Sequence, residues 1–168
     1  IVLDGDTIQL PQNNFGHCLH GGPKGWQYQV YEANPIDETT LELTRISPNG
    51  DENFPGNVTA KVLFKLTDDN AIDIKYSATT DKKTVINMTN HSYFNLAGHD
   101  AGLSAMEQKI WINASRFTQT DDASIPDGVL LDVAGTPMDF TTPKPMAPEM
   151  DDAYEQLAWA GGYDHNFV

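Results

Sequence analysis

The sequence is 168 residues long, which is within the size of one domain and is enough to bury a substantial core. Ten basic residues stand against 24 acidic ones, and the net charge of −14 would repel phosphate backbones and anionic membranes, so nucleic acid and membrane partners are not expected. No apolar run approaches the roughly 18 residues of a membrane span, and the single cysteine, Cys18, has no disulfide partner within the chain.

The first ten residues predict a β-hairpin. Two short apolar runs flank Asp4-Gly5-Asp6, and an Asp-Gly pair readily adopts the positive backbone angles of a tight hairpin turn. A polar loop follows and leads to His17 and His20, with Gly21-Gly22 directly after. Glycines beside a histidine allow the backbone to approach another group closely, which suits a binding site. The same residues also suit a plain turn that carries a surface histidine.

From residue 27 to residue 76 the sequence predicts antiparallel strands with one face in water, because apolar and polar residues alternate. The alternating apolar residues are Tyr28 and Val30, then Leu41 and Leu43, then Ala60, Val62, Phe64 and Leu66, and finally Ile72, Ile74 and Tyr76. Residues 67–70 predict a tight hairpin between the last two runs. Turns are also predicted at residues 47–51 and 54–56.

The stretch Thr84–Leu96 also alternates, and we interpret it as a strand with one polar face. Apart from Val85, that face carries only polar residues: Asn87, Thr89, His91, Tyr93 and Asn95. A histidine side chain titrates near neutrality and both donates and accepts protons, so this face suits acid/base chemistry or sugar binding. A solvent-facing edge strand would show the same pattern.

The last third of the chain predicts another strand at Lys109–Ala114, a turn at Ile125–Gly128 and then a helix. Beyond Pro148, apolar residues recur with helical spacing, acidic residues fill the first turn, and Gly161-Gly162 would end the helix. We therefore expect one short helix near residues 149–160 that packs on the sheet. In the extended segment that follows, the adjacent side chains of Asp164 and His165 would point to opposite faces.

No repeat, low-complexity tract or linker divides the sequence. We expect one all-β domain over residues 1–168, a β-sandwich of mainly antiparallel strands with one short helix. Because the chain starts with Ile1 and stops in a strand-like run, we expect it to be an incomplete part of a longer protein. The single cysteine neither indicates nor excludes an oxidising compartment; the sequence does not fix the location, and the cytoplasm is favoured. The sequence implies no oligomeric state.

Several kinds of chemistry lack their motifs. His17 and His20 lie three residues apart without a His-Glu-x-x-His or cysteine-based pattern, so no metal site is predicted. The Gly-x-Ser-x-Gly elbow of serine hydrolases and the glycine-rich phosphate loop are also absent. What remains is a set of His, Asp, Asn, Tyr and Trp residues on a β-scaffold, which suits a neutral polyol such as a sugar.

Five motifs, in order along the whole chain, resemble the signatures of the galactose mutarotase (aldose 1-epimerase) family. They are Leu19-His-Gly-Gly22 followed by Gly25-Trp26; Arg45-Ile-Ser-Pro-Asn-Gly50 with Phe54-Pro-Gly56; Asn87-Met-Thr-Asn-His-Ser-Tyr-Phe-Asn-Leu-Ala-Gly98; Gly135-Thr-Pro-Met-Asp-Phe140; and Gly162-Tyr-Asp-His-Asn-Phe167. One such match would be weak, but five collinear matches are specific.

The resemblance implies a β-supersandwich that interconverts the α and β anomers of aldohexoses such as galactose or glucose, without a cofactor or a covalent enzyme intermediate. By position in the motifs, His91 would be the general acid. His20 would contact the sugar beside it, and Asp164 would accept hydrogen bonds from sugar hydroxyls. Tyr93, on the same strand face as His91, would line the same pocket.

The chain also departs from the family pattern. Complete members are roughly twice as long, and neither the family's Asn-Arg pair before the first hairpin nor its glutamate general base has a counterpart here. We therefore assign no base within the chain and expect the chain alone to be nearly inactive, since each acid/base partner contributes about 10²- to 10⁴-fold. Two other functions fit the same residues: a non-catalytic sugar-binding β-sandwich module, and a structural domain of a larger carbohydrate-active enzyme.

Overall fold

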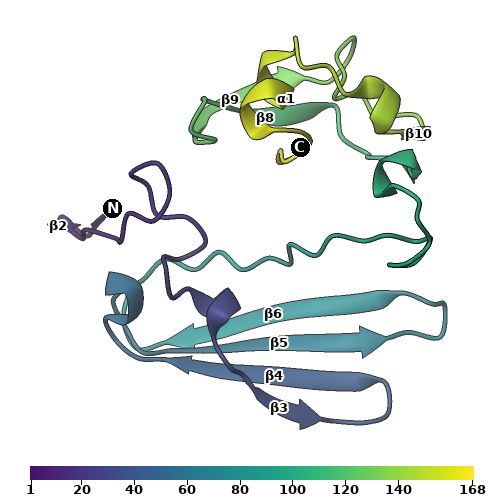
Figure 1. The fold of residues 1–168 in the computed structure, drawn as a ribbon. Helices are drawn as coiled ribbons and strands as arrows, with labels where there is room; N and C mark the ends of the chain where they lie inside the picture. The colour runs from purple at the N-terminus through teal and green to yellow at the C-terminus, as the bar shows by residue number, and fades with distance from the viewer. The chain divides into compact units, whose positions relative to one another are not determined.

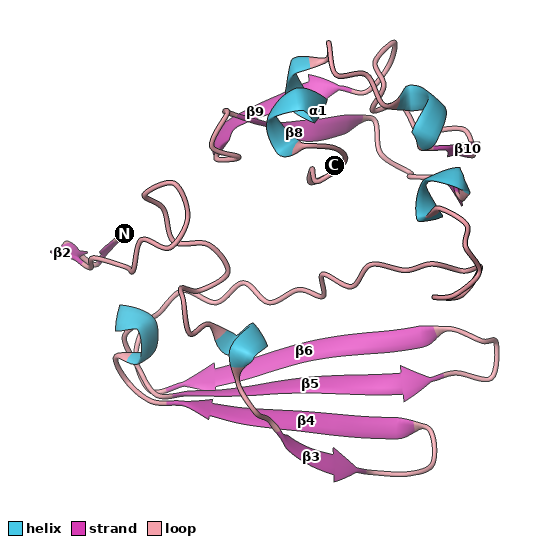
Figure 2. Cartoon of the chain, in the orientation of Figure 1, coloured by secondary structure: helices cyan, strands magenta, loops and turns pink.

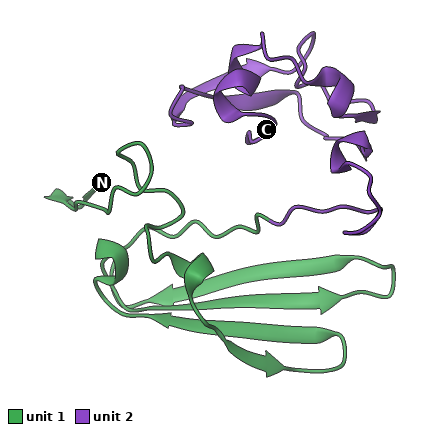
Figure 3. Cartoon of the chain, in the orientation of Figure 1, with its two compact units in different colours: residues 1–91 green, residues 92–168 purple.

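The computed structural model describes all of residues 1–168, which fall into two compact units, residues 1–91 and residues 92–168 (Figure 3). Strands dominate both units, they pair antiparallel, and the only α-helix is six residues long (Figure 2). The predicted all-β class with one short helix is therefore confirmed. Each helical segment is too short to cross a membrane.

The N-terminal hairpin of unit 1 is confirmed. β1 (Val2–Leu3) pairs antiparallel with β2 (Asp6–Thr7). Asp4 and Gly5 form the turn with φ values of 53° and 91°. These are the left-handed angles that an Asp-Gly pair adopts at low cost, which explains why the turn could be predicted from its two residues.

The body of unit 1 is a four-stranded antiparallel sheet in the order β3-β4-β5-β6 (Figure 1). Its strands are β3 (Glu32–Pro35), β4 (Thr40–Ser47), β5 (Val58–Leu66) and β6 (Ile72–Thr80). On β5 the predicted alternation holds at Ala60 and Val62, which are buried along with Val58, whereas Leu66 is 54% exposed. The predicted hairpin at residues 67–70 is confirmed, with Thr67 N donating to Ala71 O at 2.9 Å.

The strand predicted around Tyr28 and Val30 is wrong. Residues Trp26–Tyr28 form the 3₁₀ helix η1, whose turn is closed by Tyr28 N donating to Gly25 O at 3.0 Å. Tyr28 and Val30 are 71% and 92% exposed, so their alternation does not reflect burial. Two alternating apolar residues are too few to specify a strand next to a glycine-rich turn. The first strand of the sheet starts four residues later than Tyr28, at Glu32.

The β4–β5 connection contains the predicted turns and is strongly hydrogen-bonded. Gly50, with φ 88°, precedes the 3₁₀ helix η2 (Asp51–Asn53). The Asp51 carboxylate accepts hydrogen bonds from Arg45 Nη2 at 3.0 Å and from Ser47 Oγ at 2.7 Å. The connection is thereby tied to the end of β4.

The strand predicted at Thr84–Leu96 is not formed. Residues 84–95 belong to no strand (Figure 1). Many of their side chains are exposed, including Val85 at 51% and Phe94 at 67%. A strand needs a neighbour that completes its hydrogen-bond ladder, and alternation in sequence does not supply one. The polar pattern was correctly identified, but its secondary structure was not.

Unit 2 contains two small antiparallel pairs. β7 (Lys109–Ile110) pairs with β10 (Lys144–Pro145), and β8 (Arg116–Thr120) pairs with β9 (Pro126–Asp132). The strand predicted at 109–114 is thus only two residues long. Unit 2 also contains the 3₁₀ helices η3 (Ala105–Glu107) and η4 (Ala147–Glu149).

The turn predicted at Ile125–Gly128 lies earlier in the chain. Asp121 N donates to Ile125 O at 3.0 Å, and the Asp121 side chain accepts from Ala123 N and Ile125 N. Asp121 therefore makes the turn through its own carboxylate. Gly128, with φ 90°, lies within β9, near a register shift opposite Thr118–Thr120.

The predicted helix is confirmed but starts later than expected. α1 spans Glu155–Ala160 and ends at Gly161, whose φ of 67° is the predicted glycine stop. Before it, the Asp151 carboxylate accepts from Ala153 N at 2.9 Å, which gives the backbone a turn that competes with the helix. Tyr154 is extended, with φ −82° and ψ 109°. The helical spacing therefore begins before the helix itself.

The core of unit 2 explains where α1 lies. Leu157, on α1, is 1% exposed and joins a cluster with Phe117, Val133 and Met138. Gln156 is buried beside it and exchanges two hydrogen bonds with the backbone of Thr120 on β8, at 3.0 and 2.9 Å. The prediction that the helix packs on the strands is confirmed within this unit.

Candidate active site

Unit 1 brings together two of the four predicted site residues. The imidazole rings of His20 and His91 meet edge to face, with ring centroids 5.8 Å apart and planes at 73°. His20 comes from the loop after the N-terminal hairpin, and His91 from the segment that follows β6. Two histidines from distant parts of the sequence therefore share one place in the fold.

Hydrogen bonds fix the backbone that carries His20. The Asn13 side chain clamps Leu19, since its Oδ1 accepts from Leu19 N at 2.8 Å and its Nδ2 donates to Leu19 O at 3.1 Å. Gly22 N donates to Leu19 O at 3.0 Å and closes the turn around His20. His20 itself has a φ of 52°, a left-handed conformation that is uncommon for a residue with a Cβ.

The glycines after His20 lie close to other groups or have backbone angles that suit glycine. A Cβ at Gly25 would overlap the carbonyl oxygen of His20, and a Cβ at Gly22 would overlap the carboxylate of Glu52. Gly22 also has a φ of 99°, which other residues rarely adopt. These close contacts fit the role expected of the glycines, and the exposed His20 also fits the plain turn that the sequence left open.

The sequence predicts turns at residues 47–51 and 54–56 but does not single out Glu52, which lies between them. Its half-buried side chain lies against Gly22, in the loop that carries His20. The available signal was weak. Gly50 and Asn53, two residue types that tolerate positive φ, flank this carboxylate, and their φ values are 88° and 68°.

Cys18 lies in the same loop as His20, and the charge of the Glu52 carboxylate affects its thiol. Its half-buried thiol has a pKa above its ordinary value, because burial disfavours the thiolate and because the negative charge of Glu52 adds to that effect. A hydrogen bond from the Gly21 backbone acts in the opposite direction.

The segment that leads to His91 is anchored where it leaves the sheet. Asn57 donates to the Asp81 carboxylate through its backbone N at 2.7 Å and its Nδ2 at 2.6 Å. Lys82 Nζ donates to Asn49 Oδ1 at 3.1 Å, and Lys83 pairs with Asp4 of the N-terminal hairpin. These contacts tie residues 81–83 to the β4–β5 connection and to the hairpin.

The other two predicted site residues, Tyr93 and Asp164, belong to unit 2. Tyr93 is 90% exposed, and Asp164 is also exposed. The backbone around Asp164 is held against β8: Thr118 N donates to Asn166 O at 2.9 Å, and Val168 N to Arg116 O at 2.8 Å.

His165 and Asp164 point to different sides of this extended segment, as predicted. The His165 ring packs on Phe117 of the core, whereas Asp164 is exposed. Burial lowers the pKa of His165, and the nearby Asp164 charge partly opposes this shift. Both ring nitrogens of His165 are buried without a hydrogen-bond partner. The alternation therefore presents Asp164 to solvent and its neighbour to the core.

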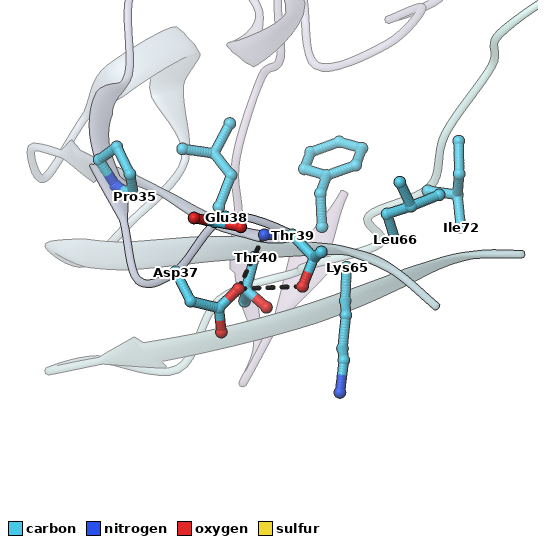
Figure 4. A pocket seen from close by; sticks show the side chains of 10 residues that line it. Pro35, Asp37, Glu38, Thr39, Thr40, Lys65, Leu66 and Ile72 are labelled. Atoms are coloured by element: carbon cyan, nitrogen blue, oxygen red, sulfur yellow. Dashed lines mark hydrogen bonds between the residues drawn. The ribbon is translucent and has the colours of Figure 1, made fainter. Parts of the chain in front are cut away.

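A separate hollow lies at the end of the four-stranded sheet, and Figure 4 shows its lining. The lining is largely apolar, with Pro35, Leu41, Phe64, Leu66 and Ile72. The Asp37 carboxylate at its rim accepts hydrogen bonds from Thr39 N and Oγ1, at 2.8 and 3.0 Å. No predicted site residue lines this hollow, so it is a poor candidate for acid/base chemistry.

The arrangement of His20 and His91 suits proton transfer to a neutral ligand. One imidazole of such a pair supplies a proton while the other donates or accepts a hydrogen bond to the same ligand. Nowhere in residues 1–168 do three His, Cys, Asp or Glu side chains gather in a way that would hold a metal ion.

Comparison with known proteins agrees with this chemistry. A family model described as Aldose 1-epimerase matches residues 1–168. Over 99% of its length, the chain is 38% identical to the aldose 1-epimerase of Escherichia coli K12 and 33% identical to the galactose mutarotase of Bos taurus. It covers 47% and 46% of those two proteins, so it spans about half the length of the curated relatives it matches.

A solved structure shows the same fold. The galactose 1-epimerase of Lactobacillus acidophilus NCFM superposes with a TM-score of 0.86 at 29% identity, over 99% of this chain and 49% of that one. This likeness confirms the β-sandwich class that the sequence predicted. From the match over all of its residues, the chain belongs to the aldose 1-epimerase family.

Proposed function

We propose that this chain is part of an aldose 1-epimerase that interconverts the α and β anomers of aldohexoses such as galactose or glucose. The observation that carries the proposal is the contact between His20 and His91, whose ring centroids lie 5.8 Å apart. These two residues occupy the two family motifs in which a histidine acts on the sugar. The family match over residues 1–168 supports the same reaction.

In this proposal His91 is the general acid. It gives a proton to the ring oxygen of the sugar while a base removes the proton of the C1 hydroxyl. The electron pair of that O–H bond forms the C1 carbonyl, and the bond between C1 and the ring oxygen breaks. Rotation about the C1–C2 bond and the reverse proton transfers then close the ring as either anomer.

The remaining predicted residues bind the substrate. His20, beside His91, is proposed to hydrogen-bond the sugar next to the transferred proton. Asp164 is proposed to accept hydrogen bonds from sugar hydroxyls, and Tyr93 to line the pocket. Both are exposed and accessible to a ligand. A neutral sugar is also compatible with the chain's net charge of −14, which would repel an anionic substrate.

The general base is proposed to lie outside residues 1–168, because no carboxylate of this chain occupies the corresponding family motif. The reaction moves protons and breaks and re-forms the bond between C1 and the ring oxygen, so it needs neither an oxidant nor a cofactor. We further propose that both units belong to one mutarotase-like domain, since the family match runs unbroken through the boundary between residues 91 and 92. A cytoplasmic location is proposed with it.

Polarimetry on freshly dissolved α-galactose and α-glucose tests the proposal. The full-length protein should accelerate the approach to the anomeric equilibrium, and residues 1–168 alone should be at least about 100-fold slower, because one acid/base partner is missing. Sugar binding by the full-length protein without acceleration would contradict the enzyme and favour a sugar-binding module. Neither binding nor acceleration would favour a structural domain.

A further inference from the structure

In addition to Phe15, three residues with a Cβ adopt left-handed backbone conformations in the two loops beside the histidine pair. Their φ values are 52° for His20, 47° for Glu52 and 68° for Asn53. Such conformations are unfavourable for side chains other than glycine, and they persist only where the surroundings over-determine them. Their occurrence in two contacting loops points to a functional reason for the conformation of Glu52.

The surroundings of Glu52 do hold it from several sides. Asp51, just before it, is bound by Arg45 and Ser47. Asn53, just after it, donates through Nδ2 to Gln9 O at 2.9 Å. Gly50 N donates to Phe54 O at 2.9 Å and closes the loop. Hydrogen bonds of the residues on both sides of Glu52 therefore fix its backbone.

The Glu52 carboxylate meets the His20 loop on both sides of His20. On one side it packs so closely against Gly22 that any Cβ there would overlap it. On the other side its charge acts on the Cys18 thiol. In the sequence, His20 lies midway between Cys18 and Gly22, in a turn closed by the hydrogen bond from Gly22 N to Leu19 O. The carboxylate therefore contacts the turn that presents His20.

We propose that Glu52 is a positioning residue: it fixes the turn at residues 18–22 so that His20 meets the sugar beside His91. This inference rests on the proposed epimerase function and adds to it a residue that acts through His20.

Because His20 is proposed to bind sugar rather than transfer the proton, loosening it should weaken binding more than chemistry. In the full-length protein, Glu52→Ala removes the carboxylate that contacts Gly22, and it is expected to raise KM for galactose about five-fold while leaving kcat within about two-fold. Glu52→Gly relieves the positive φ and should raise KM likewise without lowering Tm. Glu38→Ala, at an exposed carboxylate on another connection of unit 1, is the matched control and should change nothing.

A second readout does not depend on activity. Removing the Glu52 charge should favour the Cys18 thiolate, so Glu52→Gln should shift the pH profile of Cys18 alkylation by iodoacetamide to lower pH. Peptide mass spectrometry measures this reaction at Cys18 alone. Glu38→Gln should leave the profile unchanged.

The outcomes are distinguishable. A KM increase in Glu52→Ala and Glu52→Gly, together with the shifted alkylation profile, supports the positioning role. If wild type is active but the Glu52 variants keep its KM, or if KM and kcat change only in parallel with a lower Tm, the inference is overturned and the proposed function stands. If wild type does not interconvert anomers, both are overturned.

Discussion

His165 packs edge-on against Phe117, with ring centroids 5.5 Å apart and planes at 89°. Phe117 is fully buried, and neither ring nitrogen of His165 has a hydrogen-bond partner. The imidazole therefore contributes to the core of unit 2 as a neutral ring. A titratable side chain next to Asp164 in the sequence therefore packs on the core of unit 2.

This contact predicts a loss of stability in mild acid. Burial lowers the pKa of His165 below its ordinary value near 6.5, so the folded state binds the proton less readily than the unfolded state does. Stability should be full above about pH 6.5 and should fall as the pH drops through the lowered pKa. Urea unfolding between pH 8 and pH 5 should show this decline.

The matched variants are His165→Gln and His99→Gln. His165→Gln removes the titrating group and should flatten the decline in stability with falling pH. His99→Gln, at a side chain that is 96% exposed, should leave the decline unchanged. An identical pH slope in wild type and His165→Gln would mean that other groups cause the decline.

Gln156 is predicted to be a major stabilising residue of α1. Its side chain satisfies both the N–H and the C=O of Thr120, and it is 2% exposed. Gln156→Leu keeps the size of the side chain but leaves two buried backbone groups unpaired, each at a cost of roughly 1–3 kcal/mol. Chemical denaturation should detect the loss. Glu155→Gln, at the exposed neighbouring residue, is the control. An equal loss of stability in Glu155→Gln would contradict the role of the two Gln156–Thr120 hydrogen bonds.

Because of Tyr163, we expect the stability of the folded state to decrease at alkaline pH. Burial, with a smaller effect of the Glu149 charge, raises its pKa to about 12, and its hydroxyl donates to Pro137 O at 3.2 Å. The folded state thus holds this proton more tightly than the unfolded state, whose tyrosine pKa is about 10. Its contribution to stability should be complete below about pH 10 and should disappear as the pH rises through about 12.

Ultraviolet titration of the phenolate measures this directly. Tyr163→Phe should remove the component near pH 12 and cost about 1 kcal/mol at neutral pH for the lost hydrogen bond. Tyr28→Phe, at a residue that is 71% exposed, is the control and should leave the component near pH 12 in place. A spectrum from Tyr163→Phe that matches wild type above pH 11 would refute the assignment.

Local signals in the sequence were sufficient for the elements that local contacts make. The β5–β6 hairpin follows from long alternating runs on both sides of residues 67–70, and the helix stop follows from Gly161. Competing local interactions shifted other boundaries. The Asp121 carboxylate forms its turn before the predicted one, and the Asp151 carboxylate delays the helix to Glu155.

Non-local requirements account for the larger errors. The alternation in Thr84–Leu96 predicted a strand, yet residues 84–95 belong to no strand, because a ladder depends on a neighbour that the pattern does not specify. Within the candidate site, the motifs identified His20 and His91 in advance, and the structure places their rings together. Glu52 was missed because its role depends on a contact with Gly22, 30 residues earlier in the sequence.

The most direct test of the account is the anomerisation rate of His91→Ala in the full-length protein, measured by polarimetry with fresh α-galactose. His99→Ala, at an exposed histidine near in sequence, is the control. If His91 is the general acid, kcat should fall at least about 100-fold in His91→Ala and should stay at the wild-type value in the control. A His91→Ala variant within about two-fold of wild type would contradict the central claim.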